Sequence, residues 1–263
     1  MDFERIVNAR DLGGIRIGGK TVRSGLLLRT GHLHDATDAD IALLRDRYHL
    51  KRIFDFRTMD EAAAQPDRPV PGAGYQLLPT LDVEAERRSG EAIPAETWLD
   101  LPSHIVRLAF TPLFQRKARE LYPSLILSDF SQLQYAAFLN TILDTTDGAV
   151  LWHCSQGKDR TGIGAAVVLG ALGADRETIV ADFDRSNDSY RPLVNRFCAI
   201  VEKHGGAELE KDVVRAFMGV STRNFSRTLD LIDKQWGSLE SYITAQLGLT
   251  DEDLDTLRAR YLE

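Results

Sequence analysis

The chain has 263 residues, of which 43% are hydrophobic and 27% charged, the balance of a globular protein long enough to bury a sizeable core. The net charge is −7 and the basic residues are scattered, which excludes a general nucleic-acid binder, because such a protein needs a broad positive face. An anionic ligand must therefore be held at a small, local positive site.

Short strands and one helix are predicted in the first third of the chain. Residues 14–22 alternate around a Gly-Gly pair, as a β-hairpin does. Three further strands are predicted over residues 25–31, 51–57 and 74–81. Between the first two, Thr37 and Asp40 resemble a capping box, which predicts a helix that continues through Arg47.

The rest of the chain is mostly helical in pattern. Residues 130–143 have helical periodicity, 148–154 form an apolar strand, and nearly everything after Thr161 is helical. Residues 82–129 are too long for a structureless loop, so we expect an inserted helical subdomain or lid there. The alternation of strands and helices predicts a single α/β domain over 1–263, with a central sheet flanked by helices.

The cysteines and the apolar stretches of the sequence indicate where the protein is expected to reside. The two cysteines, Cys154 and Cys198, cannot build a disulfide framework, and they form no C-x-x-C pair for zinc. The first residues lack a signal peptide's basic start and apolar core, and the apolar stretch 162–174 is too short to span a bilayer. We expect a cytoplasmic protein, or one exported without a cleaved signal peptide, with no integral membrane segment.

The sequence HCSQGKDRTG, residues 153–162, lies between a predicted strand and a predicted helix. A tight loop with Gly157 ahead of a helix can turn successive backbone N–H groups toward an anion. Arg160 adds a guanidinium fork that can bind two phosphate oxygens, and the positive surroundings favour the thiolate form of Cys154. This combination predicts displacement at phosphorus through a phosphocysteine intermediate.

Other uses of an anion-binding cysteine loop are a sulfurtransferase, an arsenate reductase, and a phosphate-binding module without turnover. An arsenate reductase needs resolving cysteines, whereas Cys198 lies on a different predicted helix in apolar surroundings typical of a structural thiol. A sulfurtransferase loop does not require the run Lys158-Asp159-Arg160, and a dead module would not need both Cys154 and Arg160.

The loop resembles the H-C-x5-R-[S/T]-G motif of cysteine-based phosphatases, and its Gly-Lys-Asp variant resembles the bacterial atypical tyrosine and phosphoinositide phosphatases. Further similarity lies in NARDLGGIRIGGKTVRSGLLLRTGHL (8–33), in FDFRTMDE (54–61) and in WGSLESYITAQLGLTDEDLDTLR (236–258). The resemblance implies a tyrosine-phosphatase fold with a helical lid, and a reaction that needs neither metal nor cofactor. It also implies a phosphorylated protein or phosphoinositide as partner, with phosphotyrosine, phosphoserine and phosphothreonine as possible targets.

The same resemblance assigns roles within the loop. Cys154 is the nucleophile, Arg160 the phosphate clamp, and His153 orients the loop. Thr161 either donates a hydrogen bond to the sulfur or caps the following helix. The remaining members of the phosphate cradle, which contribute backbone amides, are Ser155, Gln156, Gly157 and Lys158.

The motif leaves two questions open, namely which residue is the general acid and what Lys158 does. The resemblance places the acid at Asp159, whereas most tyrosine phosphatases bring an aspartate from a separate loop, which makes Asp82 and Asp100 the alternatives. Lys158 suits a substrate with more than one phosphate, or it is a solvated lysine that supports the loop's electrostatics. Six polar residues are expected to hold the N-terminal segment and the loop together: Asn8, Arg10, Asp11, Asp55, Arg57 and Glu61.

Overall fold

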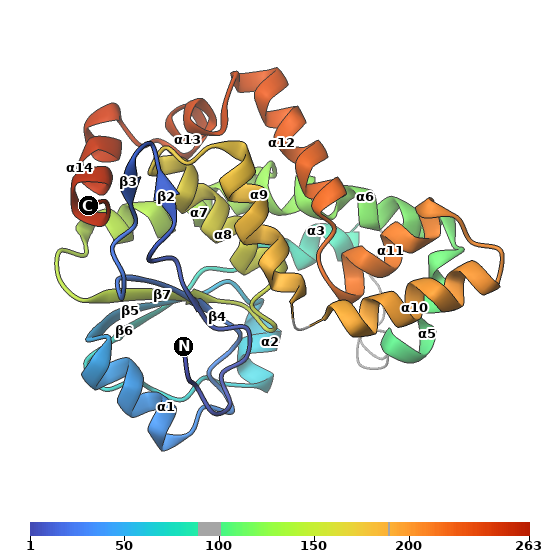
Figure 1. Cartoon of the computed structure of the whole chain (residues 1–263), viewed down its shortest axis with the longest axis horizontal. Coiled ribbons are helices and arrows are strands. Elements are labelled where there is room, and N and C mark those ends of the chain that lie inside the picture. The colour runs from blue at the N-terminus through green and yellow to red at the C-terminus, as the bar shows by residue number, and fades with distance from the viewer. Residues whose placement is uncertain (89–100, 189) are drawn as a thin grey trace.

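A computed structural model describes residues 1–88, 101–188 and 190–263 of the chain (Figure 1). Its centre is a five-stranded sheet in the order β1-β4-β7-β5-β6, in which only β1 is antiparallel to its neighbour. The strands of this sheet are β1 (Arg10–Asp11), β4 (Leu27–Thr30), β5 (Leu50–Asp55), β6 (Gly74–Leu77) and β7 (Ala149–His153). A separate hairpin joins β2 (Arg16–Ile17) to β3 (Lys20–Thr21), as predicted for residues 14–22.

The central strand β7 is buried along its whole length, as expected for a parallel strand with both faces covered. Its side chains alternate between two cores. Val150 and Trp152 pack into the larger core, under the helices that follow the sheet, whereas Ala149 and Leu151 face the smaller one. The sheet is therefore flanked by helices on both faces, as predicted.

The two faces are covered unequally (Figure 1). On the smaller core lie α1 (Asp38–Ala42) and the π-helical turn Leu43–Arg47, which together replace the single helix expected up to Arg47. The helices that pack over the larger core are α7 (Asp129–Asp144), α8 (Asp159–Ala171), α9 (Arg176–Asp184), α12 (Thr222–Trp236), α13 (Leu239–Leu247) and α14 (Asp251–Tyr261). A short 3-10 turn, Arg185–Asn187, follows α9.

The described part of the predicted insertion is helical, with α3 (Val83–Arg88), α5 (Leu101–Ala109) and α6 (Pro112–Ile126). Helices α5 and α6 pack with α10 (Arg191–Lys203) and α11 (Glu208–Met218) around a separate apolar core, which we call the outer helical cluster. Its most buried members include Ile105, Val201, Val213 and Val214. The C-terminal half of α6 instead joins the larger core, so α6 links the cluster to the sheet.

Two short elements had no counterpart in the prediction: β1, which has only two residues, and α2 (Met59–Ala64). Helix α2 begins at a capping box in which Thr58 and Glu61 bond each other's backbone amides. Among the described helices, none combines the length and the apolar character that a membrane crossing requires.

Candidate active site

The loop from His153 to Asp159 lies at the carboxyl edge of the parallel strands, where α/β sheets place their ligands. The amide of His32, just after β4, donates to the Ser155 carbonyl (3.3 Å), and the amide of Phe56, just after β5, donates to the His153 carbonyl (2.9 Å). Cys154 lies at the start of the loop and is 2% exposed. The loop is thus fixed between the ends of the two neighbouring strands.

The outer side of the loop is held through its carbonyl groups. The side-chain Nδ2 of Asn8 donates to the carbonyl of Gly157 (2.8 Å), and Nη2 of Arg29 donates to the same oxygen (3.1 Å). Because the C=O and N–H of one peptide point in opposite directions, the Lys158 amide is turned away from these donors. Residues from the N-terminal segment and from β4 thereby orient the peptides of the predicted cradle.

The remaining N-terminal residues act at different points. Arg10 donates to the Asn8 side chain (2.8 Å) and to the carbonyl of Asp182 in α9 (3.1 Å). Arg10 therefore connects Asn8 to α9. Asp11 instead accepts the amides of Gly13 and Gly25, which closes the turn beyond β1. Asn8 and Arg10 therefore join the N-terminal segment to the loop, whereas Asp11 stabilises the segment itself.

Arg160 is oriented by Glu61 of α2. The guanidinium binds both carboxylate oxygens, at 2.6 and 2.8 Å, and Ser155 Oγ donates to Glu61 at 2.7 Å. Burial alone would raise the pKa of Glu61, but the charge and hydrogen bonds of Arg160 lower it well below its usual range. A planar two-point pair of this kind fixes the guanidinium plane as well as its position.

Beneath the loop lies a buried ion cluster. Nε2 of His153 lies 2.9 Å from Oδ2 of Asp67, and Nη2 of Arg57 lies 2.7 Å from Asp55 and 3.1 Å from Asp67. Burial alone would raise the pKa of Asp67, but its contacts with His153 and Arg57 lower it. Ligand atoms of His153, Asp55 and Asp67 lie within 4.8 Å of one another, yet Arg57 already supplies these carboxylates with a cation.

Lys158 and Asp159 are bound to each other and to distant segments. Nζ of Lys158 donates to Oδ2 of Asp159 (2.6 Å) and to the carbonyl of Gly219 (2.8 Å), while the Tyr122 hydroxyl donates to Oδ1 of Asp159 (3.1 Å). Lys158 is 6% exposed, so the alternative of a solvated lysine is wrong. Its ammonium group joins the loop to the segment that follows α11.

Thr161 is the third residue of α8 rather than its N-cap, so the alternative of a helix-opening cap is wrong. Its hydroxyl is buried and has no hydrogen-bond partner within the described ranges of the chain. Gln156 is exposed on the loop, and its backbone carbonyl accepts a hydrogen bond from the side-chain Nδ2 of Asn8 at 3.3 Å.

The alternative acids lie elsewhere. Asp82 accepts the Ala85 amide (2.9 Å) at the start of α3, and Asp100 falls outside the described residues. Cys198 is partly buried on α10 in the outer helical cluster, and its Sγ lies 3.9 Å from the Lys211 carbonyl.

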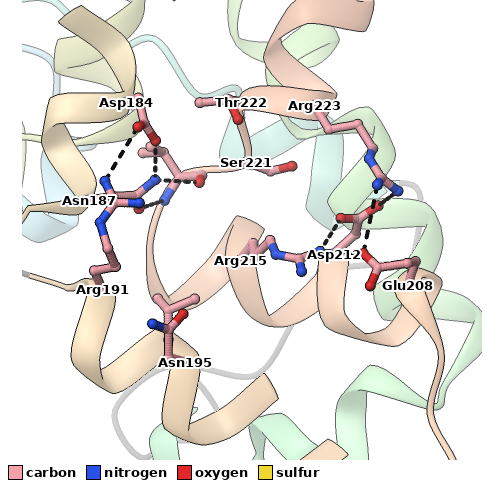
Figure 2. Close-up of a pocket in the computed structure, with 12 residues that line it drawn as sticks. Asp184, Asn187, Arg191, Asn195, Glu208, Asp212, Arg215, Ser221, Thr222 and Arg223 are labelled. Atoms are coloured by element: carbon pink, nitrogen blue, oxygen red, sulfur yellow. Dashed lines mark hydrogen bonds and ion pairs between the residues drawn. The ribbon is translucent and has the colours of Figure 1, made fainter. Parts of the chain in front are cut away.

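A cavity of about 270 Å³ lies among α10, α11 and the start of α12 (Figure 2). Its arginines face carboxylates: Arg215 and Arg223 both bind Asp212, and Arg191 binds Asp184. The cavity is bordered by Ser221, two residues after Gly219, whose carbonyl accepts a hydrogen bond from Lys158. It lies beyond the segment that contacts the loop, and its paired charges give it no surplus positive charge for a phosphate.

Several residues that shape the loop were not found from the sequence, namely Arg29, Asp67, Tyr122 and Asp182. Arg29, Tyr122 and Asp182 are polar residues within or beside apolar stretches, and such residues are buried only with partners. That signal identifies these three as members of some buried polar network but not of this one. Asp67 lies in the run QPDRP, residues 65–69, which carries no such signal.

Comparison with known proteins agrees with this geometry. The profile of the tyrosine phosphatase family matches residues 1–263. A putative tyrosine-protein phosphatase of Cupriavidus necator is 28% identical over 262 residues, covering 99% of this chain and 87% of that protein. The triple specificity protein phosphatase PtpB of Mycobacterium tuberculosis is 29% identical over 253 residues, covering 90% and 91%. These matches favour a phosphatase over a sulfurtransferase or an arsenate reductase, and the chain belongs to the tyrosine phosphatase family of hydrolases.

Proposed function

We propose that this phosphatase hydrolyses phosphate monoesters through a phosphocysteine intermediate, without a metal ion or cofactor. The observation that carries the proposal is the junction of β7 and α8, where buried Cys154 and the Glu61-oriented Arg160 bracket one loop. The loop's carbonyls are held from outside, which supports amides directed toward a bound phosphate.

In the first step, the Cys154 thiolate attacks phosphorus, an S–P bond forms and the bond from phosphorus to the ester oxygen breaks. Arg160 and the loop amides bind the equatorial oxygens, over which the transition state spreads its charge. Asp159 gives its proton to the departing oxygen, so the product leaves as a phenol or alcohol.

In the second step, a water molecule attacks the phosphorus of the phosphocysteine, its proton passes to Asp159, and the S–P bond breaks. Inorganic phosphate and the thiolate are released, which restores the starting state. The buried Thr161 hydroxyl, which has no partner within the described part of the chain, is available to hydrogen-bond the departing sulfur. His153, held by Asp67, positions the peptide that carries Cys154.

The substrate class we propose is phosphotyrosine in proteins, extended to phosphoserine, phosphothreonine and phosphoinositides. The triple specificity in the name of the mycobacterial relative supports testing more than one class of phosphorylated substrate. Lys158 within the loop supports substrates with a second phosphate, provided that its ammonium group exchanges the Gly219 carbonyl for that phosphate.

A direct test measures p-nitrophenyl phosphate hydrolysis in the presence of a metal chelator. Cys154→Ser should abolish turnover and retain vanadate binding, whereas Cys198→Ser, the matched control, should keep full activity. Arg160→Lys should lose most of kcat, because a point charge cannot bind two oxygens in one plane. Full activity of Cys154→Ser would contradict the mechanism. Loss of activity of the unmodified enzyme in the presence of the chelator would also contradict it.

We also propose that the outer helical cluster restricts access to Cys154. Tyr122 of α6 and the segment after α11 both contact the loop, and Cys154 itself is 2% exposed. Ile105→Val removes one methylene from the cluster, and Ile41→Val removes the same group from the opposite side of the sheet. Only Ile105→Val should accelerate inactivation by peroxide, and equal rates in both variants would refute the role.

A further inference from the structure

The hydrogen bonds of Tyr122 give its hydroxyl group one fixed direction. The backbone amide of Ser221, at the start of α12 (Figure 2), donates to the Tyr122 oxygen at 3.0 Å. An amide N–H can only donate, so the phenol is the acceptor in that bond. Its own proton is therefore directed at Oδ1 of Asp159, at 3.1 Å.

The ring of Tyr122 cannot turn away from this position. It is fully buried and packs edge-on against Phe183, with ring centres 5.2 Å apart, and against Phe225 at 6.0 Å. Burial raises the pKa of Tyr122 well above its ordinary value, so the hydroxyl keeps its proton. A phenylalanine would fill the same space, which means that packing alone does not require the hydroxyl group.

From this geometry we propose that Tyr122 is a positioning residue for the general acid. It holds Oδ1 of Asp159 as an acceptor, which leaves Oδ2 as the oxygen that carries the transferable proton. In this structure Oδ2 accepts a hydrogen bond from Lys158. Oδ2 can therefore carry the proton, which the second step takes from the attacking water, only when the ammonium group turns from Oδ2 toward the bound phosphate. The inference rests on the proposed role of Asp159.

The position of Tyr122 in the chain adds to the argument. It lies on α6, within the segment predicted to be an insertion, 37 residues before Asp159. The insertion thereby supplies part of the surroundings of the acid, in addition to any cover over the site. The hydrogen bond from Tyr122 to Asp159 therefore couples the position of α6 to the position of the Asp159 carboxylate.

The test uses Tyr122→Phe and a series of aryl phosphates whose leaving groups differ in basicity. Tyr242→Phe is the matched control, because the Tyr242 hydroxyl is also buried and donates to a carbonyl of α6, that of Ile126. Thermal unfolding of both variants reports the cost of each lost bond. Asp159→Asn and the double variant with Tyr122→Phe complete the set.

We expect Tyr122→Phe to lower kcat/KM about 10-fold for phenyl phosphate and less than about 3-fold for p-nitrophenyl phosphate, within the ~10²–10⁴-fold that a general acid contributes. The KM of Tyr122→Phe should stay unchanged, and Tyr242→Phe should show the same leaving-group dependence as the unmodified enzyme. The double variant should be no slower than Asp159→Asn. A uniform loss across leaving groups in Tyr122→Phe, with a strong dependence in Asp159→Asn, would overturn the inference alone. A uniform loss in Asp159→Asn would instead overturn the role of Asp159 as the acid.

Discussion

A methyl group at position 157 provides a sharp test of the loop geometry. Gly157 has a φ of +68°, and a Cβ atom there would lie 2.5 Å from the carbonyl carbon and oxygen of Thr30 and 2.6 Å from the amide nitrogen of Gly31. All of these are backbone atoms at the buried end of β4, which cannot rotate away as a flexible side chain could. Gly157→Ala must therefore move either the strand or the loop.

The size of the effect follows from two contributions. A left-handed conformation in a residue with Cβ costs roughly 1–2 kcal/mol of folding free energy. Ordinary contact begins near 3.4 Å, so the loop must move by roughly 1 Å, and a displacement of that size can cost ~10²-fold in rate. We expect Gly157→Ala to lose about 10²-fold in kcat and to lower the free energy of unfolding by ~2 kcal/mol.

Gly18→Ala separates the two contributions. Gly18 has a φ of +53°, and a Cβ there meets nothing within 4 Å, so the substitution brings the same backbone strain without the clash. It should lower the free energy of unfolding by ~1 kcal/mol and leave kcat unchanged. Urea unfolding and p-nitrophenyl phosphate kinetics measure both quantities. Equal kcat values for the two variants would refute the link between the close approach to β4 and catalysis.

Three further substitutions test the charges around the loop. Glu61→Gln should lower kcat about 10-fold by releasing the guanidinium of Arg160. Because folding lowers the pKa of Glu61, the loss of stability in this variant should be complete above about pH 5 and vanish in strong acid. A difference in urea midpoint that does not change with pH would contradict this. Lys158→Met should reduce kcat/KM more for a phosphoinositide than for a phosphotyrosine peptide, because the variant lacks the ammonium group proposed to bind the second phosphate; equal losses would restrict Lys158 to joining the loop to the segment after α11. Asp82→Asn should leave the leaving-group dependence unchanged, since the Asp82 carboxylate is engaged at the start of α3, and a steeper dependence would make it the acid.

The loop itself was predictable from sequence because its chemistry is contiguous. Cys154, Gly157 and Arg160 follow one another at intervals of three positions, so a strand before them and a helix after them suffice to place them in one loop. The central strand was equally clear, since a run such as Ala149–His153, buried on both faces, can be recognised from its apolar composition. Local pattern and tertiary position coincide for these elements.

The partners of the loop were predicted only in part. The resemblance pointed to Asn8 and Arg10, which do join the N-terminal segment to the loop. Glu61 lies 99 residues before Arg160, and the Glu61 side chain was expected only to help hold the N-terminal segment and the loop together. Its capping box also gives it a complete local explanation, in which the carboxylate bonds the Thr58 amide. Only the order of strands in the sheet brings the end of β5, and with it α2, beside the loop that follows β7. The sequence therefore did not show that this carboxylate binds Arg160, and helix α2, which positions it, was not predicted either.

The deepest support of the loop is an ion pair that no local pattern indicates. Arg29 of β4 is fully buried, binds Asp182 of α9 at 2.5 Å through Nη1, and reaches the Gly157 carbonyl through Nη2. Removing one partner of such a pair costs about 3–5 kcal/mol because the other charge remains buried, so the pair constrains the fold strongly even where its net contribution to stability is small. One guanidinium thus ties a helix beyond the motif to the peptide that shapes the cradle. Buried charges outside the motif therefore help to determine the position of the loop, whereas the motif supplies the groups that we propose bind the phosphate.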